Sequence, residues 1–454
     1  MDYIDIFERW RDAAAMLDES SRQELDRISF DAREIEERFS SELAFGTGGM
    51  RGKLGVGTAR MNRYTVRRAT HGYAAYLLAR VPGAREAGVV IARDPRRGSS
   101  EFVDETASVL ASHGIRVWLF DDIRPTPVLS YAVRELGAAG GIVITASHNP
   151  PEYNGYKAYD SHGVQLLPDA ARDVADRARA VDDYLSPPGE PKAAVEYVDA
   201  AVDESYVRRV LDLVNGIAGA LAPREARAAF GLIYTPLHGT GHVFVPRVLH
   251  ELGFGSAQVV AEQSVPDGAF PTVTYPNPED PGAFEMAIAQ AHSSGGPRPE
   301  IILATDPDCD RVGVAVWDRA AESYRVLTGN QTGVLLADFL IESVRVCGQD
   351  PAACAIIKTI VSTEMATAIA AAAGVKVIDT LTGFKYIGER IGEVEEAGDR
   401  FLLGFEESCG YLAGSFVGDK DAVIASALIA CAAVRQGLRG RSLLERLDEL
   451  FREY

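Results

Sequence analysis

Three aspartates alternate in the segment TDPDCDR, which follows the apolar run EIILA. Asp306, Asp308 and Asp310 are spaced so that, on a loop, their carboxylates could surround one cation. Acids this close repel one another unless a cation lies between them, and carboxylate oxygens suit Mg²⁺ better than zinc or copper. A solvated acidic turn is the alternative, since the segment lacks the glycine and distal glutamate of an EF-hand loop. Arg311, directly after the acids, favours a phosphate held beside a metal.

A serine follows another apolar run, Ile142–Ile144, in the segment TASHNPP. Ser147 does not stand in a GxSxG nucleophile motif, and His148 is not an obvious base because adjacent side chains usually diverge. The segment does provide a hydroxyl at the end of a strand and two prolines that stiffen the backbone beyond it. Taken alone, it fits a plain turn better than a nucleophile.

These segments together indicate phosphoryl transfer. A serine can carry a phosphoryl group covalently, and a metal can neutralise the charge of that group and position it for in-line attack. Lys157 lies ten residues after Ser147 and is a candidate proton-transfer group, because a lysine crowded by other cations has a lowered pKa. A solvated surface lysine is the alternative.

Apolar runs of β type alternate with helical patterns along most of the chain, which is typical of parallel α/β units. We expect strands at 88–93, 116–121, 140–145, 229–234, 256–261, 300–305, 354–360, 375–380 and 400–405. Ligands bind beyond the carboxyl ends of parallel strands. The loops after these runs are therefore expected to carry the functional residues.

Segments outside these strands have patterns that predict helices and a linker. Residues 3–39 resemble amphipathic helices, and the Pro/Gly-rich segment 186–191 resembles a linker. A helix is expected after this linker because Val207, Val210, Leu211 and Val214 fall on one face.

Size and composition limit the classes of protein to which this chain could belong. The 454 residues predict roughly two to four domains. A net charge of −19 disfavours a general nucleic-acid surface but allows an anionic substrate if bases gather locally. Five cysteines without a CxxC pair favour neither a disulfide framework nor a thiolate zinc site. No apolar run approaches about 18 residues, so the expectation is a cytoplasmic protein without a membrane segment.

Three segments jointly resemble motifs of the α-D-phosphohexomutase superfamily. TASHNPPEYNGYK resembles its phosphoserine loop, DPDCDR its metal loop and GFEESCGY, at 404–411, its sugar-binding loop. The motifs occur in the family's order. The variants FGTGGMRG, NGYKAYDSHGVQL and FVGDKDAV are similar to the branch that includes phosphopentomutase, glucose-1,6-bisphosphate synthase and bacterial α-phosphoglucomutases.

The resemblance implies an α/β fold of three successive α/β-layered domains. A helical extension would occupy residues 1–40, and the phosphoserine, metal and sugar-binding loops would lie in domains at 41–200, 201–322 and 323–454. The family's fourth domain, which carries a RxSGTEP-like phosphate-binding loop, is not recognised. Truncation of a full mutase, a partner that supplies the missing part and a shortened protein with altered activity are the explanations, and truncation is favoured.

The resemblance also assigns roles to the residues around the serine and the metal. Ser147 matches the serine that is phosphorylated in the active enzyme, and its phosphate would complete the Mg²⁺ shell with the three aspartates. Lys157 matches a general acid or base, and His148 holds an active-site position beside the serine. Arg51 matches an arginine that reaches the same centre, and Arg311 matches one that helps to hold the phosphate.

Further residues match the sugar-binding part of the family's site. Glu406 and Ser408 match the pair that recognises sugar hydroxyls, which suits a carboxylate acceptor beside a hydroxyl. Lys385 matches a base that selects the orientation of the sugar, with an exposed turn lysine as the alternative. His238, in TPLHGTG, fits either a structural turn or a catalytic role. A solvated or salt-bridged cluster is expected for Arg93, Asp94, Arg96 and Arg97.

The expected function is that of an isomerase, most similar to phosphoglucomutase. It would move a phosphoryl group between the C1 and C6 (or C5) oxygens of a phosphosugar through a phosphoserine and a sugar bisphosphate, with Mg²⁺ as cofactor and a sugar bisphosphate as activator. A sugar-bisphosphate synthase, a weak phosphatase and a sugar-phosphate-binding protein without full mutase activity are the alternatives. The intact serine, lysine and aspartate set disfavours the last of these.

Overall fold

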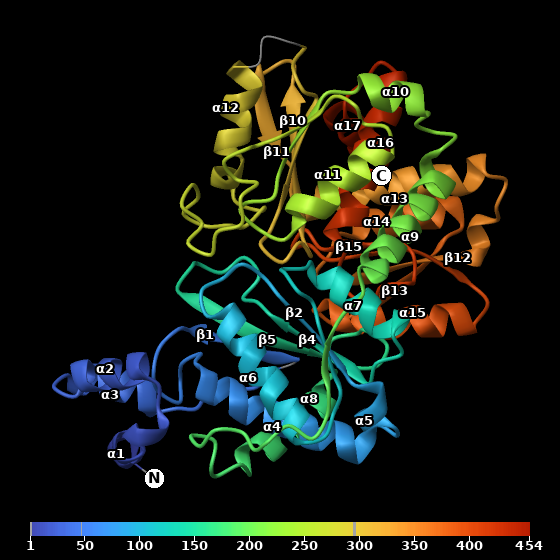
Figure 1. Ribbon diagram of the computed structural model, residues 1–454. Helices are drawn as coiled ribbons and strands as arrows, with labels where there is room; N and C mark the ends of the chain where they lie inside the picture. Colours follow the sequence, from blue (N-terminus) through green and yellow to red (C-terminus); the bar gives the residue numbers. More distant parts are fainter. Residues whose placement is uncertain (1, 47, 294–296) are drawn as a thin grey trace. The chain divides into compact units, whose positions relative to one another are not determined.

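The computed structural model describes residues 2–46, 48–293 and 297–454 (Figure 1). Thr47, in the segment FGTGGMRG, lies outside the described residues. The chain forms two compact units. The first consists of the residues up to Ile123 together with Ala132–Val198, and the second consists of Arg124–Tyr131 together with Asp199–Tyr454.

The first unit begins with three short helices, as predicted for residues 3–39: α1 (Tyr3–Asp12), α2 (Glu19–Ile28) and α3 (Ala32–Phe39). Each follows an aspartate whose side chain accepts hydrogen bonds from the first-turn backbone, which satisfies amides that lack a helical partner. The ring of Trp10 packs edge-on against Phe39 and against Tyr64, with centroids 5.7 and 5.3 Å away. This aromatic cluster anchors the extension on the first unit.

The first unit contains a six-stranded sheet in the order β1-β5-β4-β2-β3-β6. Its strands are β1 (Gly49–Lys53), β2 (Val89–Arg93), β3 (Val117–Leu119), β4 (Gly140–Ile144), β5 (Tyr153–Tyr159) and β6 (Val195–Tyr197). Its longer helices are α4 (Arg63–Arg80), α6 (Ser99–Ser112) and α8 (Pro168–Arg179), and α4 packs against both others. A short helix, α5 (Ala84–Ala87), precedes β2. Helix α7 (Thr126–Glu135) precedes β4, and its residues up to Tyr131 belong to the second unit.

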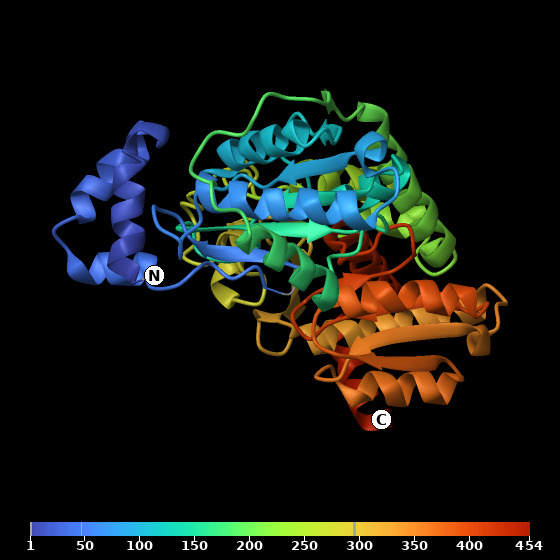
Figure 2. The ribbon, with the colours of Figure 1, turned by 90° about the horizontal axis from the view of Figure 1, so that it is seen from below.

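The second unit contains two sheets. One has the order β11-β10-β9-β7-β8, with β7 (Leu232–Thr235), β8 (Ala257–Val259), β9 (Ile301–Thr305), β10 (Val312–Asp318) and β11 (Ser323–Val326). The other has the order β13-β12-β14-β15, with β12 (Cys354–Thr359), β13 (Lys376–Thr380), β14 (Arg400–Phe405) and β15 (Tyr411–Leu412). Helices lie on both faces of this second sheet (Figure 2).

The helices of the second unit are α9 (Ala200–Ala218), α10 (Arg224–Ala229), α11 (Gly241–Glu251), α12 (Glu285–Ser293), α13 (Gly329–Val346), α14 (Glu364–Ala373), α15 (Phe384–Glu396), α16 (Ala422–Leu438) and α17 (Leu443–Glu453). The predicted face of α9 is confirmed for Val207, Val210 and Val214, which are buried. Helix α16 is buried along nearly all its length and packs against α9, α11 and α13. An all-round apolar helix of this kind belongs in a core.

The expected parallel α/β units are present, for example in the pairs β2–β3 and β2–β4, and all three sheets also contain antiparallel strands. Strand β5 runs antiparallel to β1 and β4, β10 runs antiparallel to β9, and β15 runs antiparallel to β14. In each of the pairs β4–β5, β9–β10 and β14–β15 a short loop returns the chain directly, and such a loop permits only antiparallel pairing. The TASHNPP, DPDCDR and ESCG segments are these return loops.

Among the described residues, no single helix is long and apolar enough to cross a membrane, and α16 with α17 passes that test only as a pair bent by 83°. The five cysteines are free thiols, and Cys347 is the exposed one.

Candidate active site

Ser147 lies on the loop that follows β4, is only 2% exposed and has a left-handed backbone with φ of 51°. Its N–H donates to Thr145 Oγ1 at 2.8 Å, and its Oγ lies 3.3 Å from His148 Nδ1. The expectation that these adjacent side chains diverge is therefore wrong. The serine hydroxyl has a ring nitrogen within hydrogen-bond reach.

Two further predicted residues lie on strands beside this loop. Arg51 on β1 donates from Nη1 to Asn149 Oδ1 at 2.9 Å, which brings its guanidinium to the serine loop. Lys157 on β5 stands opposite Val143 of β4 and Gly49 of β1. It is 8% exposed, so the alternative of a solvated surface lysine is wrong.

The three aspartates lie on the loop after β9 and are buried, at 0 to 1% exposed. One carboxylate oxygen from each lies within 4.8 Å of the others. Asp306 Oδ1 accepts hydrogen bonds from the backbone N–H groups of Asp310 and Arg311, at 3.1 and 3.0 Å. The alternative of a solvated turn is wrong, and three buried carboxylates at this spacing fit a hard divalent cation.

Sequence reasoning missed two residues that contact these acids. Thr126 Oγ1 donates to Asp308 Oδ2 at 2.8 Å. Lys420 Nζ lies 3.3 Å from Asp310 Oδ2 and 3.2 Å from Asp419 Oδ1. The only signal for Lys420 was its place in the segment FVGDKDAV, and Thr126 had none.

Burial and neighbouring acids act in opposite directions on the two cations here. Burial alone would lower the pKa of Lys420, but Asp310, Asp419 and Glu406 raise it above its ordinary value. The pKa of Arg311 is likewise raised, because Asp310 and Asp306 outweigh the effect of burial. Both side chains are therefore held in their charged forms beside the aspartates.

Glu406 follows β14, is 5% exposed and donates its N–H to the carbonyl of Gly410 at 2.9 Å. Burial raises the pKa of its carboxyl, while Lys420 and Arg311 act to lower it. The N–H of Val312 donates to the carbonyl of Cys409 at 3.1 Å. This bond joins the predicted sugar-binding turn to the strand that follows the aspartates.

Ser408 is half-buried in the same turn. Lys385 lies in the first turn of α15 and is 6% exposed, and burial lowers the pKa of its ammonium. The alternative of an exposed turn lysine is therefore wrong. The second unit thus gathers the aspartates, Arg311 and Glu406, with Ser408 on the turn that bears Glu406.

His238 lies in a turn whose own residues engage its ring. Its Nδ1 lies 2.9 Å from the carbonyl of Val265, and its Nε2 lies 2.9 Å from Thr272 Oγ1. Both ring nitrogens are thus engaged inside a loop where the residue is 2% exposed. These contacts fit the structural-turn alternative, and the role of His238 stays a prediction.

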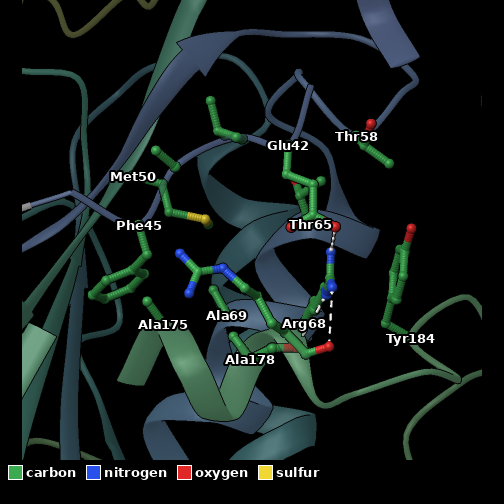
Figure 3. Close-up of a pocket in the computed structure, with 13 residues that line it drawn as sticks. Glu42, Phe45, Met50, Thr58, Thr65, Arg68, Ala69, Ala175, Ala178 and Tyr184 are labelled. Atoms are coloured by element: carbon green, nitrogen blue, oxygen red, sulfur yellow. Dashed lines mark hydrogen bonds and ion pairs between the residues drawn. The ribbon is translucent and has the colours of Figure 1, made fainter. Parts of the chain in front are cut away.

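The first unit also contains a cavity of about 150 Å³ (Figure 3). Phe45, Met50, Ala69 and Ala175 line it, and Arg68 at its wall is ion-paired with Glu42 at 2.7 Å. None of the predicted site residues lines this cavity. The candidate chemistry lies instead at the strand ends.

Three mixed sheets with flanking helices, each with a candidate functional loop after one of its strands, define a multidomain α/β protein. Family models described as phosphoglucomutase/phosphomannomutase alpha/beta/alpha domains I, II and III match residues 42–185, 204–319 and 328–454. The chain belongs to the phosphoglucomutase/phosphomannomutase family.

Curated relatives and solved structures agree with this assignment. A probable phosphoribomutase of Schizosaccharomyces pombe is 35% identical over 447 residues, which cover 96% of this chain and 74% of the relative. A phosphoglucomutase of Staphylococcus haemolyticus is 37% identical over 431 residues, 92% of this chain and 74% of the relative. A putative phosphomannomutase structure from Thermus thermophilus aligns with a TM-score of 0.69 at 25% identity, covering 90% of this chain and 83% of that one.

These similarities confirm the predicted superfamily, the fold of three α/β domains and the class of enzyme, a phosphosugar mutase of phosphoglucomutase type. The predicted domain boundaries at residues 40, 200 and 322 stay predictions, as do the roles of individual site residues.

Proposed function

We propose that this mutase transfers phosphoryl groups through Ser147, between the C1 and C6 (or C5) oxygens of a small phosphosugar. One observation carries the proposal: in a chain of this family, Ser147 is a buried serine in a left-handed backbone at the end of a sheet strand. Strained residues of this kind concentrate at functional sites.

Each transfer exchanges one oxygen–phosphorus bond for another. In the first, the bond between Ser147 Oγ and phosphorus breaks as a sugar hydroxyl oxygen bonds to the phosphorus; a base takes the hydroxyl proton, and Ser147 Oγ takes up a proton. The resulting sugar bisphosphate reorients. In the second transfer Ser147 Oγ gives up its proton and bonds to the other phosphorus, the bond between that phosphorus and the sugar oxygen breaks, and the sugar oxygen takes up a proton. Free sugar bisphosphate would then act as an activator, because it can load an unphosphorylated Ser147.

The proton transfers are assigned to side chains near the serine. Lys157 is the proposed general acid or base, and its position on a strand fixes its backbone. His148 Nδ1, at 3.3 Å from Ser147 Oγ, is close enough to exchange a proton with the hydroxyl form of the serine. Arg51 is proposed to hold phosphate at the same loop.

The acids on the loop after β9 are proposed to hold the cofactor. Asp306, Asp308 and Asp310 would bind one Mg²⁺, which when bound neutralises phosphoryl charge and orients the group for in-line attack. Arg311 is proposed to bind phosphate oxygens beside these acids.

The turn after β14 is proposed to recognise the sugar. Glu406 would accept hydrogen bonds from sugar hydroxyls, and Ser408 can donate or accept. Lys385 is proposed to select between the two orientations of the bisphosphate.

The test is an interconversion assay with glucose 1-phosphate, Mg²⁺ and glucose 1,6-bisphosphate. The wild-type protein is expected to form glucose 6-phosphate faster when the bisphosphate is added, and Ser147→Ala is expected to abolish the reaction. Ser108→Ala, an exposed serine on α6, is the matched control. Release of inorganic phosphate without glucose 6-phosphate would instead favour a phosphatase, and full activity of Ser147→Ala would refute the proposal.

A further inference from the structure

The backbone of Ser147 needs support from its surroundings. A serine with φ of 51° occupies a region that L-residues adopt only when neighbouring structure imposes it. The serine loop joins β4 to β5 without a helix or strand of its own. Whatever fixes this loop also fixes the direction of the Ser147 hydroxyl.

The guanidinium of Arg96 donates to four carbonyls of the segment that contains this loop. Its Nη2 reaches the carbonyl oxygen of Ser147 at 2.6 Å and also that of Asn149. Its Nη1 reaches the carbonyl oxygens of Pro150 and Tyr153 at 2.8 and 3.1 Å. The side chain is fully buried. A planar guanidinium has five N–H donors and can serve four carbonyls at once, whereas a lysine ammonium has only three donors.

Asp94 contacts both Arg96 and a residue that binds the backbone of Ser147. Its Oδ2 lies 3.2 Å from Arg96 Nε and accepts a hydrogen bond from Thr145 Oγ1 at 2.6 Å. That same threonine oxygen accepts the N–H of Ser147 at 2.8 Å. The buried ion pair therefore holds the carbonyl of Ser147 directly and its N–H through one hydroxyl.

We propose that Asp94 and Arg96 are positioning residues for phosphoryl transfer, which hold Ser147 Oγ in one orientation through both transfers. The inference rests on the proposed role of Ser147 as phosphate carrier. Two in-line transfers to opposite ends of a sugar need the same serine geometry twice. Because Asp94 balances the charge of Arg96, the contribution of the pair is geometric and adds no net charge beside the phosphate.

The discriminating variant is Arg96→Lys, which keeps the charge but loses the fork that reaches several carbonyls. The rate at which glucose 1,6-bisphosphate phosphorylates Ser147, followed by intact mass at several concentrations, separates a maximal rate from a half-saturating concentration. Arg96→Lys is expected to lower the maximal rate about 100-fold, the scale of a displacement of about 1 Å, with little change in half-saturation. Arg97→Lys, on the exposed neighbouring residue, is expected to match the wild type.

A second variant tests the same inference if Arg96→Lys does not fold. Thr145→Val keeps the side-chain volume but removes the hydroxyl between Asp94 and the Ser147 N–H, and it should also lower the maximal rate. Wild-type rates in a folded Arg96→Lys or Thr145→Val protein, or a change confined to half-saturation, would overturn the positioning role alone. A wild-type protein that never takes phosphate at Ser147 would overturn the proposed function and this inference with it.

Discussion

A left-handed non-glycine residue lies in each of the three return loops that carry candidate chemistry, and others lie elsewhere, for example at His238. Ser147 follows β4, Cys309 lies among the aspartates and Cys409 lies in the turn after Glu406, with φ of 51°, 54° and 61°. Backbone strain of this kind costs about 1 to 3 kcal/mol per residue and persists where surrounding contacts enforce it. In these three loops the surrounding contacts therefore impose the backbone conformation and with it the direction of the side chains.

The aspartate cluster gives a prediction for a single residue. Asp308→Asn is expected to lower Mg²⁺-dependent mutase activity by at least about 100-fold, because a bound metal contributes several kcal/mol and each 1.4 kcal/mol is about tenfold in rate. Activity is measured against Mg²⁺ concentration, with folding checked by thermal unfolding. Glu262→Gln, an exposed acid of the same unit, is the control. An unchanged Mg²⁺ dependence would reject the metal assignment.

The sequence was sufficient to identify most candidate site residues, but not the residues that contact them in the folded chain. Ser147 taken alone fitted a plain turn, and it was selected only because the aspartate and sugar-binding segments occur with it in the order of a known family. Thr126, Lys420 and Arg96 act through contacts with residues 182, 110 and 51 positions away. A periodic pattern in one sequence carries no information about such long-range pairing, so these residues became visible only in the folded chain.

Strand prediction from the sequence was limited in a similar way. Every predicted strand lies where a strand forms, because buried parallel strands are continuous apolar runs. The strands that were not predicted include β1, β5 and β10, which pair antiparallel. Strands β1 and β5 have the sequences GMRGK and YNGYKAY, in which glycines and charged residues interrupt the apolar pattern of a strand.

Close pairing of β1 with β5 leads to a prediction at Gly49. A Cβ there would collide with the backbone carbonyl of Tyr156, so Gly49→Ala should separate the strands and move Arg51 from the serine loop. The free energy of unfolding is expected to fall by about 1 to 3 kcal/mol, together with activity, as measured by chemical denaturation and turnover. Gly189→Ala, where a Cβ meets open space, should change neither. Wild-type stability and activity of Gly49→Ala would contradict the close pairing.

The start of α16 leads to a prediction about pH. Asp421 caps this helix and accepts the Tyr206 hydroxyl at 2.7 Å, and burial raises its pKa from 3.8 to about 6. Between these values the folded protein holds a proton that the unfolded chain releases. Its contribution to the free energy of unfolding should thus fall as pH rises from about 4 to about 6, by up to about 3 kcal/mol.

Asp421→Asn removes this titration and should flatten that part of the stability profile, measured by urea denaturation between pH 4 and 7. The same substitution at Asp199, the exposed cap of α9, controls for the loss of a capping carboxylate. Identical slopes for the wild type and Asp421→Asn would contradict the assignment.

At the scale of the whole molecule, the net charge is negative, but cations gather at the candidate site. The chain carries a net charge of −19, yet the buried Lys420 and the half-buried Arg311 are held charged beside the candidate metal loop. Local cations and a bound metal can hold an anionic substrate despite a repulsive surface.

The chain matches domains I to III of the family and spans about three quarters of the length of its curated relatives, 74% of each of the two described above.

The central claim is that Ser147 carries the phosphoryl group, and intact mass spectrometry tests it most directly. The purified wild-type protein, treated with phosphatase and then incubated with glucose 1,6-bisphosphate and Mg²⁺, is expected to gain one phosphate, located at Ser147 by fragmentation. Ser147→Ala is expected to gain none, and Ser108→Ala to gain one. A wild-type protein that never takes phosphate, or phosphate located at another residue, would contradict the account.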